Sequence, residues 1–233
     1  MALISNLRTR NLQNELMDSP KLDPARFVGS LVGLRRVNIA TRSARILLPP
    51  LEAMARADGS LRVLDVACGG GDVAITLSRR LMGLGVEVHG CDVNPLAVEH
   101  AEEAAKRADS AALFFRLDAV TDPIPSGYDV VMSSLFLHHL SESHAREFLA
   151  KTAEAAGRMV LIHDLVRGRA GHLLAYIGVR ALLCNDVCHQ DGPRSVEGAF
   201  TIDEAKALAA AAGLEGCSVA PRFPFRFLLT WRK

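Results

Sequence analysis

Short apolar runs alternate along the chain with longer stretches in which apolar residues recur at helical spacing. The runs begin at Leu61, Val86, Ala112, Tyr128 and Arg158, and several of them are rich in β-branched residues. Short, mostly apolar runs of this kind are typical of parallel strands that are buried on both faces. The amphipathic stretches between the runs predict helices, so the pattern favours an α/β fold.

The first run ends in three consecutive glycines. The string LDVACGGGD, residues 64–72, predicts a strand and a tight turn, and residues 73–78 continue at helical spacing. Such a turn lets a ligand lie against the backbone, and the helix after it directs free N–H groups toward that ligand. Gly69-x-Gly71-x-x-Ala74 formally fits the dinucleotide fingerprint. However, the carboxylate of Asp65, near the end of the strand, suits a positively charged ligand better than a pyrophosphate.

Two further acidic residues follow the ends of predicted strands. Asp92 ends the run that begins at Val86 and lies roughly 20 residues beyond the glycines, the spacing at which a carboxylate reaches ribose hydroxyls. Asn94 and Pro95 then predict the N-cap and the first residue of a helix. Asp118 ends the next run. The carboxylate of Asp92 is therefore a candidate ligand contact.

The glycine string and the string YDVVMSSLFLHHL, residues 128–140, resemble motifs of class I S-adenosylmethionine (SAM) dependent methyltransferases. The segment FTIDEAKALAAAAGL, residues 200–214, resembles the stretch before the last hairpin in that superfamily. The resemblance covers residues 60–165 and 200–233. It implies an α/β fold: a Rossmann-like, open, seven-stranded, mostly parallel sheet with helices on both faces, an N-terminal helical segment and a helical lid insertion.

The same resemblance implies SAM as the cofactor, S-adenosylhomocysteine (SAH) as its product, and a set of residues around them. The methionine part of SAM would lie among Asp65, Ala67, Cys68, Gly69, Gly71, Ser134 and Leu135. The ribose would meet Asp92 and Val93, and the adenine would meet Asp118 and Ala119.

Histidines near the ends of two predicted strands are candidate catalytic bases. His139 follows the fourth run, and either it or its neighbour His138 would face the acceptor. His163 ends the fifth run, next to Asp164. Histidine is the usual general base near neutral pH, although a histidine in such a place also serves as a hydrogen-bonded structural residue. We assign His139 and His163 as candidate bases, because a phenol acceptor gains from a base that takes up its proton.

Two segments lie outside the alternating pattern. Residues 1–57 are predicted to form an N-terminal helical cap, in which Pro49-Pro50 ends one helix or begins the next. Residues 58–233 are predicted to form the SAM-binding domain, with residues 167–198 inserted as a substrate lid. The lid contains an apolar helix over residues 172–184. After it, Thr201 and Glu204 predict a capping box at the start of a further helix.

Composition narrows the choice of partners. Hydrophobic residues make up 49% of the 233 residues and the net charge is +1, so no nucleic-acid partner is indicated. Five cysteines without a secreted-type framework favour reduced thiols and a cytoplasmic location. Cys184, Cys188 and His189 match no standard zinc spacing, so no metal is expected. The amino terminus lacks a signal-peptide core and no run reaches membrane-span length, so no stable membrane insertion is expected.

We therefore expect a SAM-dependent methyltransferase that methylates oxygen on a small, apolar, aromatic or polyketide-like acceptor by in-line transfer. The apolar lid motivates this acceptor, although residues 170–184 equally suit a homodimer face. The alternatives are an NAD(P)-dependent oxidoreductase, a non-catalytic SAM-binding regulator and an RNA methyltransferase. Asp65 and the lack of a Tyr-x-x-x-Lys pair argue against the first, and an undamaged SAM motif argues against the second. Against the third, the sequence shows neither an added RNA-binding module nor a strong positive charge.

Overall fold

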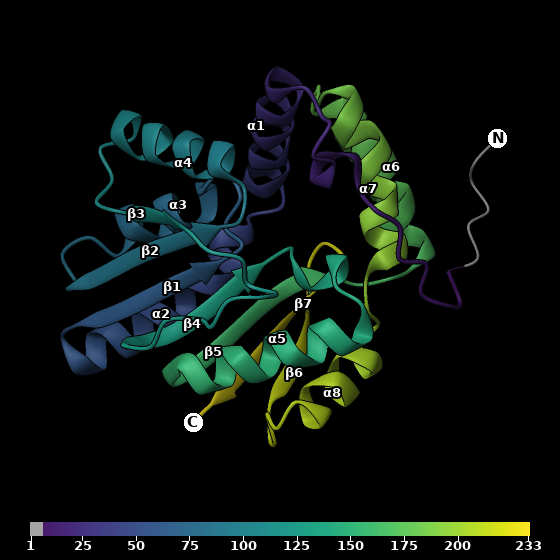
Figure 1. The fold of residues 1–233 in the computed structure, drawn as a ribbon. Coiled ribbons are helices and arrows are strands. Elements are labelled where there is room, and N and C mark those ends of the chain that lie inside the picture. Colours follow the sequence, from purple (N-terminus) through teal and green to yellow (C-terminus); the bar gives the residue numbers. More distant parts are fainter. Residues whose placement is uncertain (1–6) are drawn as a thin grey trace.

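The central sheet has seven strands in the order β3-β2-β1-β4-β5-β7-β6 (Figure 1). The structure is a computed structural model that describes residues 7–233. The first five strands run parallel, and β7 lies antiparallel between β5 and β6. The strands are β1 (Leu61–Val66), β2 (Val86–Asp92), β3 (Leu113–Arg116), β4 (Tyr128–Ser134), β5 (Ala156–Leu165), β6 (Ser218–Arg222) and β7 (Arg226–Arg232). The predicted open, mostly parallel, seven-stranded sheet is therefore confirmed.

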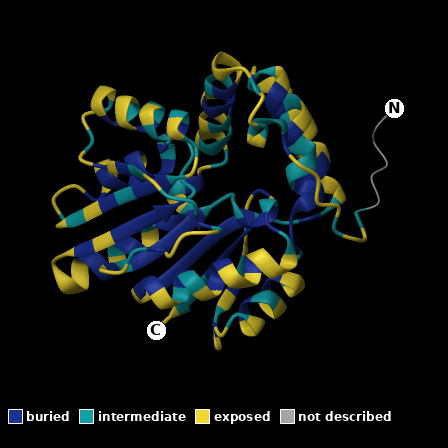
Figure 2. Cartoon of the chain, in the orientation of Figure 1, coloured by how far each residue is buried: buried dark blue, intermediate teal, exposed yellow. Residues whose placement is uncertain are grey.

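Helices cover both faces of the sheet, as predicted. In β1, Leu61 and Val63 pack with α2, α3 and α4, whereas Leu64 and Val66 pack with α5 and α8. All four side chains are buried, and Figure 2 shows mostly buried residues along β4 and β5 as well. The covering helices are α2 (Ser43–Asp58), α3 (Asp72–Arg80), α4 (Pro95–Arg107), α5 (Glu142–Ala155) and α8 (Ile202–Ala211).

Short-range capping signals place several helix starts where the sequence predicts them. The Asn94 side chain accepts the N–H of Leu96 and caps α4. Thr201 and Glu204 form both hydrogen bonds of a capping box at the start of α8. Because each cap satisfies N–H groups that the first helical turn leaves free, it contributes about 1 kcal/mol.

Three helices and one extended segment stand over the carboxyl ends of the parallel strands (Figure 1). The helices are α1 (Pro24–Ala40), α6 (Arg169–Ala181) and α7 (Asp186–Gly198). The extended segment, residues 10–18, lies along α7 and ends in the 3-10 helix η1 (Leu16–Asp18). We call this segment the strap, and the strap together with α1, α6 and α7 the roof.

Polar contacts fix the strap in place. The two carboxylate oxygens of Asp191, on α7, accept the N–H groups of Leu16 and Met17 at 2.8 and 3.0 Å. Arg10 reaches the 3-10 helix η2 (Leu137–His139) and the end of α7. Its guanidinium donates to the backbone oxygens of Gly198, His138 and Leu140. The strap therefore joins α7 to the segment that follows β4.

One sequence-based expectation is wrong. Pro49 and Pro50 neither end nor begin a helix, because both lie inside α2. Each proline removes a helical hydrogen bond, and the complete burial of Leu47 and Leu51 against the sheet offsets that cost. The stretch after the predicted lid helix forms a helix of its own, α7, which Asn185 caps by accepting the N–H of Cys188.

Helix α6 exposes apolar side chains. Leu173, Leu174 and Ile177 are 45%, 43% and 52% exposed, and the last two contribute to the cavity described below. No helix within residues 7–233 combines the length and the apolar character that crossing a membrane requires.

We expect Asp191→Ala to lower the free energy of unfolding by about 1–3 kcal/mol, because it leaves two strap N–H groups without their acceptor. Urea denaturation of the full chain measures this. Asp186→Ala, also on α7, is the matched control: its ion pair with Arg26 is exposed, so its loss costs less than about 1 kcal/mol. Equal stability of the two variants would contradict the role given to Asp191.

Candidate active site

A cavity of about 1110 Å³ lies between the carboxyl ends of the parallel strands and the roof. Loops after β1, β2, β3 and β4 form its floor, and the roof and the residues just before β7 form its walls. The strand order changes direction between β1 and β4, the place where open α/β sheets bind ligands. The volume exceeds the roughly 300–1,000 Å³ of a pocket for one drug-sized ligand, so two small molecules fit side by side.

The loop between β1 and α3 presents its backbone to the cavity. Gly69 and Gly71 have φ angles of +54° and +73°, in the left-handed region that glycine adopts without strain. A Cβ on Gly71 would also lie 2.7 Å from the ring of Phe114. The Asp92 carboxylate accepts the N–H of Gly69 and the N–H of Asn94, both at 2.9 Å. Asp92 therefore ties the glycine loop to the end of β2 and keeps further lone pairs for a ligand.

Most of the residues predicted to hold the cofactor come together on the cavity surface. They are Ala67, Cys68, Gly69, Asp92, Val93, Asp118, Ala119, Ser134 and Leu135. Asp65, Gly71 and the candidate base His163 are not part of that surface, whereas the other candidate base, His139, is.

Asp65 lies behind the glycine loop. Its side chain is buried, and its Oδ1 has no hydrogen-bond partner among the described residues. Burial, reinforced by the charges of Asp72 and Asp92, raises the pKa of Asp65 well above its ordinary value. A buried carboxyl group in this state favours a neighbour that brings a hydrogen-bond donor or a positive charge.

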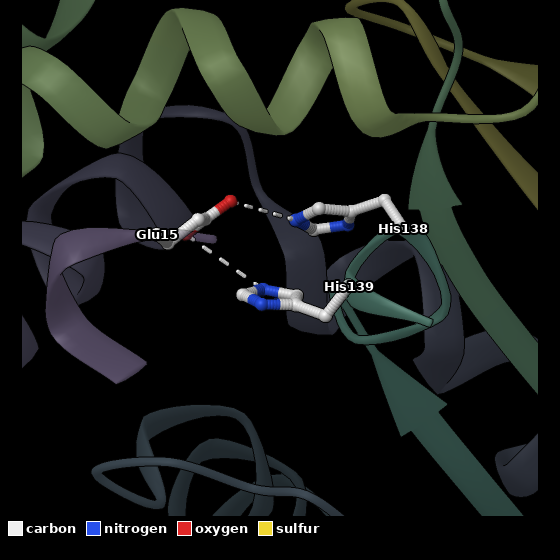
Figure 3. Close-up of side chains that lie close together, drawn as sticks. All are labelled: Glu15, His138 and His139. Atoms are coloured by element: carbon white, nitrogen blue, oxygen red, sulfur yellow. Dashed lines mark ion pairs between the residues drawn. The ribbon is translucent and has the colours of Figure 1, made fainter. Parts of the chain in front are cut away.

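Glu15, His138 and His139 form a cluster on the cavity wall (Figure 3). Nδ1 of His138 lies 2.6 Å from Oδ1 of Asp164, and Nδ1 of His139 lies 3.0 Å from Oδ2 of Asp18. The two Nε2 atoms lie 3.7 and 3.8 Å from the two oxygens of Glu15. Both imidazoles therefore direct Nε2 toward one carboxylate, which the strap supplies.

The carboxylates of this cluster attract positive charge. Burial disfavours the protonated form of His139, but Glu15 and Asp18 outweigh it and raise the pKa of His139 to about 9. Burial likewise disfavours the ionised form of Asp164, but His138 holds the pKa of Asp164 below its ordinary value. Asp164 is therefore ionised at neutral pH, and the carboxylates of the cluster favour a positive charge beside them.

His163 is fully buried at the end of β5. Its Nδ1 lies 2.9 Å from Oγ of Ser134, and its Nε2 is buried without a partner among residues 7–233. Burial, with the charge of Arg226 second, lowers the pKa of His163 to about 3. A neutral imidazole held off the cavity surface positions Ser134, so the candidate base that reaches the cavity is His139, beside His138.

Two cavity residues have no signal in the sequence. Arg226, at the start of β7, is 5% exposed; its Nη1 donates to the backbone oxygen of Pro224, and its Nε has no partner in the described part of the chain. Burial lowers the pKa of Arg226 to about 10, so it stays cationic at neutral pH. Glu15 comes from a polar segment without periodicity. The sequence thus predicts the floor of the cavity better than its walls.

Residues 63–156 match the profile of a family described as "Methyltransferase domain". This stretch begins in β1, contains the glycine loop and all of β4, and ends where β5 begins. Residues 63–156 therefore form a methyltransferase domain of this family.

The methyltransferase domain is also similar to individual enzymes. It is 34% identical over 122 residues to the 3-hydroxy-5-methyl-1-naphthoate 3-O-methyltransferase of Streptomyces sahachiroi, covering 50% of this chain and 34% of that protein. It is 29% identical over 125 residues to the ubiquinone biosynthesis O-methyltransferase of Albidiferax ferrireducens, covering 52% and 48%. The matches therefore span half or less of the length of these curated relatives.

A solved structure supports the fold. Magnesium protoporphyrin IX methyltransferase of Synechocystis, crystallised with SAH, superposes with a TM-score of 0.59 at 17% sequence identity. The superposition covers 92% of this chain and 90% of that one.

The cavity has features that fit SAM, the ligand bound in a solved methyltransferase structure that resembles this chain. The glycine loop leaves backbone free for close approach, and Asp92 has lone pairs for ribose hydroxyls. The unpartnered Oδ1 of Asp65 lies behind the loop, where the ammonium group of a bound amino acid tail would supply the missing charge.

Free energy of unfolding should depend on pH through His163. Its folded pKa of about 3 lies below the ordinary 6.5, so between these values the unfolded chain binds more protons. Stability is therefore complete above about pH 6.5 and falls below it, by up to about 1.4 kcal/mol per pH unit. Urea unfolding at several pH values should show a shallower slope for His163→Gln. The exposed His144→Gln is the control, and equal slopes in all three proteins would refute the assignment.

Proposed function

We propose that this chain transfers a methyl group from SAM to an oxygen atom of a small, largely apolar acceptor. The observation that carries the proposal is a single cavity with the glycine loop in its floor and a cluster of imidazoles and carboxylates in its wall. Both named relatives are O-methyltransferases, and the name of the Streptomyces enzyme states a hydroxynaphthoate acceptor. These names support oxygen as the methylated atom.

When bound, SAM supplies a methyl group on a sulfonium, which becomes the thioether of SAH as the methyl group leaves. In this proposal Ala67, Cys68 and Gly69 hold the methionine part together with Ser134 and Leu135. Asp92 and Val93 meet the ribose, and Asp118 and Ala119 meet the adenine. Holding two reactants in line lowers a barrier by roughly 7–11 kcal/mol, so positioning is the main contribution of the chain.

Methylation of a hydroxyl group releases a proton, which a group on the acceptor side of the cavity has to take up. As the acceptor oxygen forms its bond to the methyl carbon, the proton of its hydroxyl group has to leave. The cluster around His139 lies on the cavity wall and accepts positive charge readily, because Glu15, Asp18 and Asp164 surround its imidazoles. His139, with a pKa of about 9, already carries a proton at neutral pH, so we place the departing proton on its neighbour His138, whose Nδ1 lies against Asp164.

The roof defines what the acceptor can be. Leu174, Ile177 and Val179 of α6 contribute apolar side chains to the cavity, and Arg226 contributes a buried positive charge. An aromatic acceptor that carries a carboxylate would satisfy both, since its ring packs on α6 and its carboxylate pairs with the guanidinium. In this proposal residues 167–198 serve as the substrate lid over a SAM-binding domain of residues 58–233, and residues 1–57 serve as the cap.

Calorimetric titration of the full chain with SAM, SAH and NADH tests the cofactor. We expect SAM and SAH to bind, and Asp92→Ala to weaken both by at least about tenfold, which is 1.4 kcal/mol. Glu87→Ala, on an exposed position of the same strand, should leave both affinities unchanged. Binding of NADH in place of SAM would overturn the proposal.

The acceptor class is tested with a panel of hydroxyarenes, with and without a carboxylate, by detecting the methylated product by mass spectrometry. We expect Arg226→Gln to raise KM for carboxylated acceptors by about tenfold or more while changing neutral acceptors little, because only the former lose a charge-assisted contact. Equal effects on both groups would exclude Arg226 as the carboxylate partner. Methylation of protein or nucleic acid alone would exclude a small acceptor.

A further inference from the structure

The geometry points to a divalent transition-metal site formed by Glu15, His138 and His139, with its open coordination positions facing the cavity. This inference rests on the proposed function, because an acceptor oxygen is the ligand that the open positions would take. It revises the expectation from sequence that no metal is bound.

The distances within the cluster suit a metal ion better than direct contacts. The ligand atoms, one from each residue, all lie within 4.8 Å of one another. The separations of 3.7 and 3.8 Å between the Nε2 atoms and the Glu15 oxygens are too long for hydrogen bonds. They are shorter than roughly 4.2 Å, the span of two in-line metal–ligand bonds of about 2.1 Å. Figure 3 shows both imidazoles directed toward the Glu15 carboxylate, so the three ligand atoms face one another.

A second residue orients each of the three ligands. Asp164 and Asp18 bind the Nδ1 atoms of His138 and His139, which leaves each Nε2 as the free ring nitrogen. Ser195 on α7 donates its hydroxyl hydrogen to Oε1 of Glu15 at 2.5 Å. Histidines that bind metals almost always donate their other N–H to a carboxylate, a carbonyl or water, and ligating carboxylates are themselves hydrogen-bonded.

The local charge also favours a cation. Three carboxylates, those of Glu15, Asp18 and Asp164, surround two imidazoles. Of the nearby cations, Arg10 donates to backbone oxygens, and Arg226 is directed to the oxygen of Pro224 while its charge reaches Asp164. Within residues 7–233, Glu15 has no ion pair with lysine or arginine.

The ligand set indicates which metals fit. Two imidazoles and one carboxylate, with positions left open, bind Zn²⁺ or Fe²⁺ in other proteins, whereas Mg²⁺ prefers oxygen ligands. A cation here would stabilise negative charge on the acceptor oxygen, and the imidazoles would then act as ligands while the proton passes to water. In this arrangement the positive charge next to the three carboxylates would come from a metal ion instead of from a proton on an imidazole.

Metal binding is measured on the full chain after removal of bound ions with a chelator. We expect calorimetry to show one Zn²⁺ per chain, and Co²⁺ to give a visible absorption spectrum of a site with nitrogen and oxygen ligands. Glu15→Gln and His139→Gln should each weaken Zn²⁺ binding by at least about tenfold and remove the Co²⁺ spectrum. Circular dichroism establishes that both variants are folded.

Two controls locate the ion. His144→Gln removes an exposed imidazole, and Cys188→Ser removes one of two neighbouring buried thiols, which are the alternative ligands for Zn²⁺ in this chain. Both should bind Zn²⁺ as tightly as the unaltered chain. Absence of stoichiometric binding, or binding that Cys188→Ser abolishes and Glu15→Gln preserves, overturns the metal site.

SAM titration of the chelator-treated chain separates the two proposals. SAM binding and full methyl transfer in chelator would overturn the metal site and leave the proposed function intact. Zn²⁺ binding that requires Glu15, in a chain that does not bind SAM, would overturn the proposed function and support the metal site. Methyl transfer that falls in chelator and returns with Zn²⁺, Co²⁺ or Fe²⁺ would support both.

Discussion

The hydrogen bond between Asp164 and His138, 2.6 Å long, is the contact on which the walls of the cavity depend. Asp164 lies near the end of β5 and His138 lies in η2, so the bond joins the segments that leave two neighbouring parallel strands. Arg10 of the strap donates to the backbone oxygen of His138, and the strap in turn places Glu15. Both partners are buried, so removing either would leave a polar group without its hydrogen bond, at a cost of about 1–3 kcal/mol or more.

The floor and the roof of the cavity are stabilised by different forces. The loops of the floor follow strands whose side chains are buried on both faces of the sheet. Packing of those strands therefore fixes where the loops lie. The roof is joined by small apolar clusters and by hydrogen bonds between segments that are distant in the sequence, such as those from the strap to Asp191 and from Asn185 to the backbone oxygen of Arg26. Individual polar contacts of this kind contribute about 1 kcal/mol each, so each stabilises the roof less than burial of a large apolar side chain stabilises the sheet under the floor.

The same distinction explains how much the sequence could predict. Strands β1 to β5, the glycine turn and the cap of α8 are each specified by neighbouring residues, and Asp92 and Asp118 follow because parallel strand ends share one edge of the sheet. The helix through Pro49-Pro50 depends on burial of Leu47 and Leu51, which local propensity opposes. Glu15 and Arg226 reach the cavity only through tertiary contacts, and the burial that removes His163 from the cavity surface has no local signature.

The separation of floor and roof has a consequence for how this chain can diversify. Nearly all residues assigned to the cofactor lie in the floor, whereas the apolar side chains of α6 and the charge of Arg226 lie in the walls. A substitution at Leu174 or Ile177 changes the space that meets the acceptor and touches neither Asp92 nor the glycine loop. New acceptors are therefore accessible through single exchanges on one exposed helix, while the cofactor chemistry and the folded sheet are inherited unchanged.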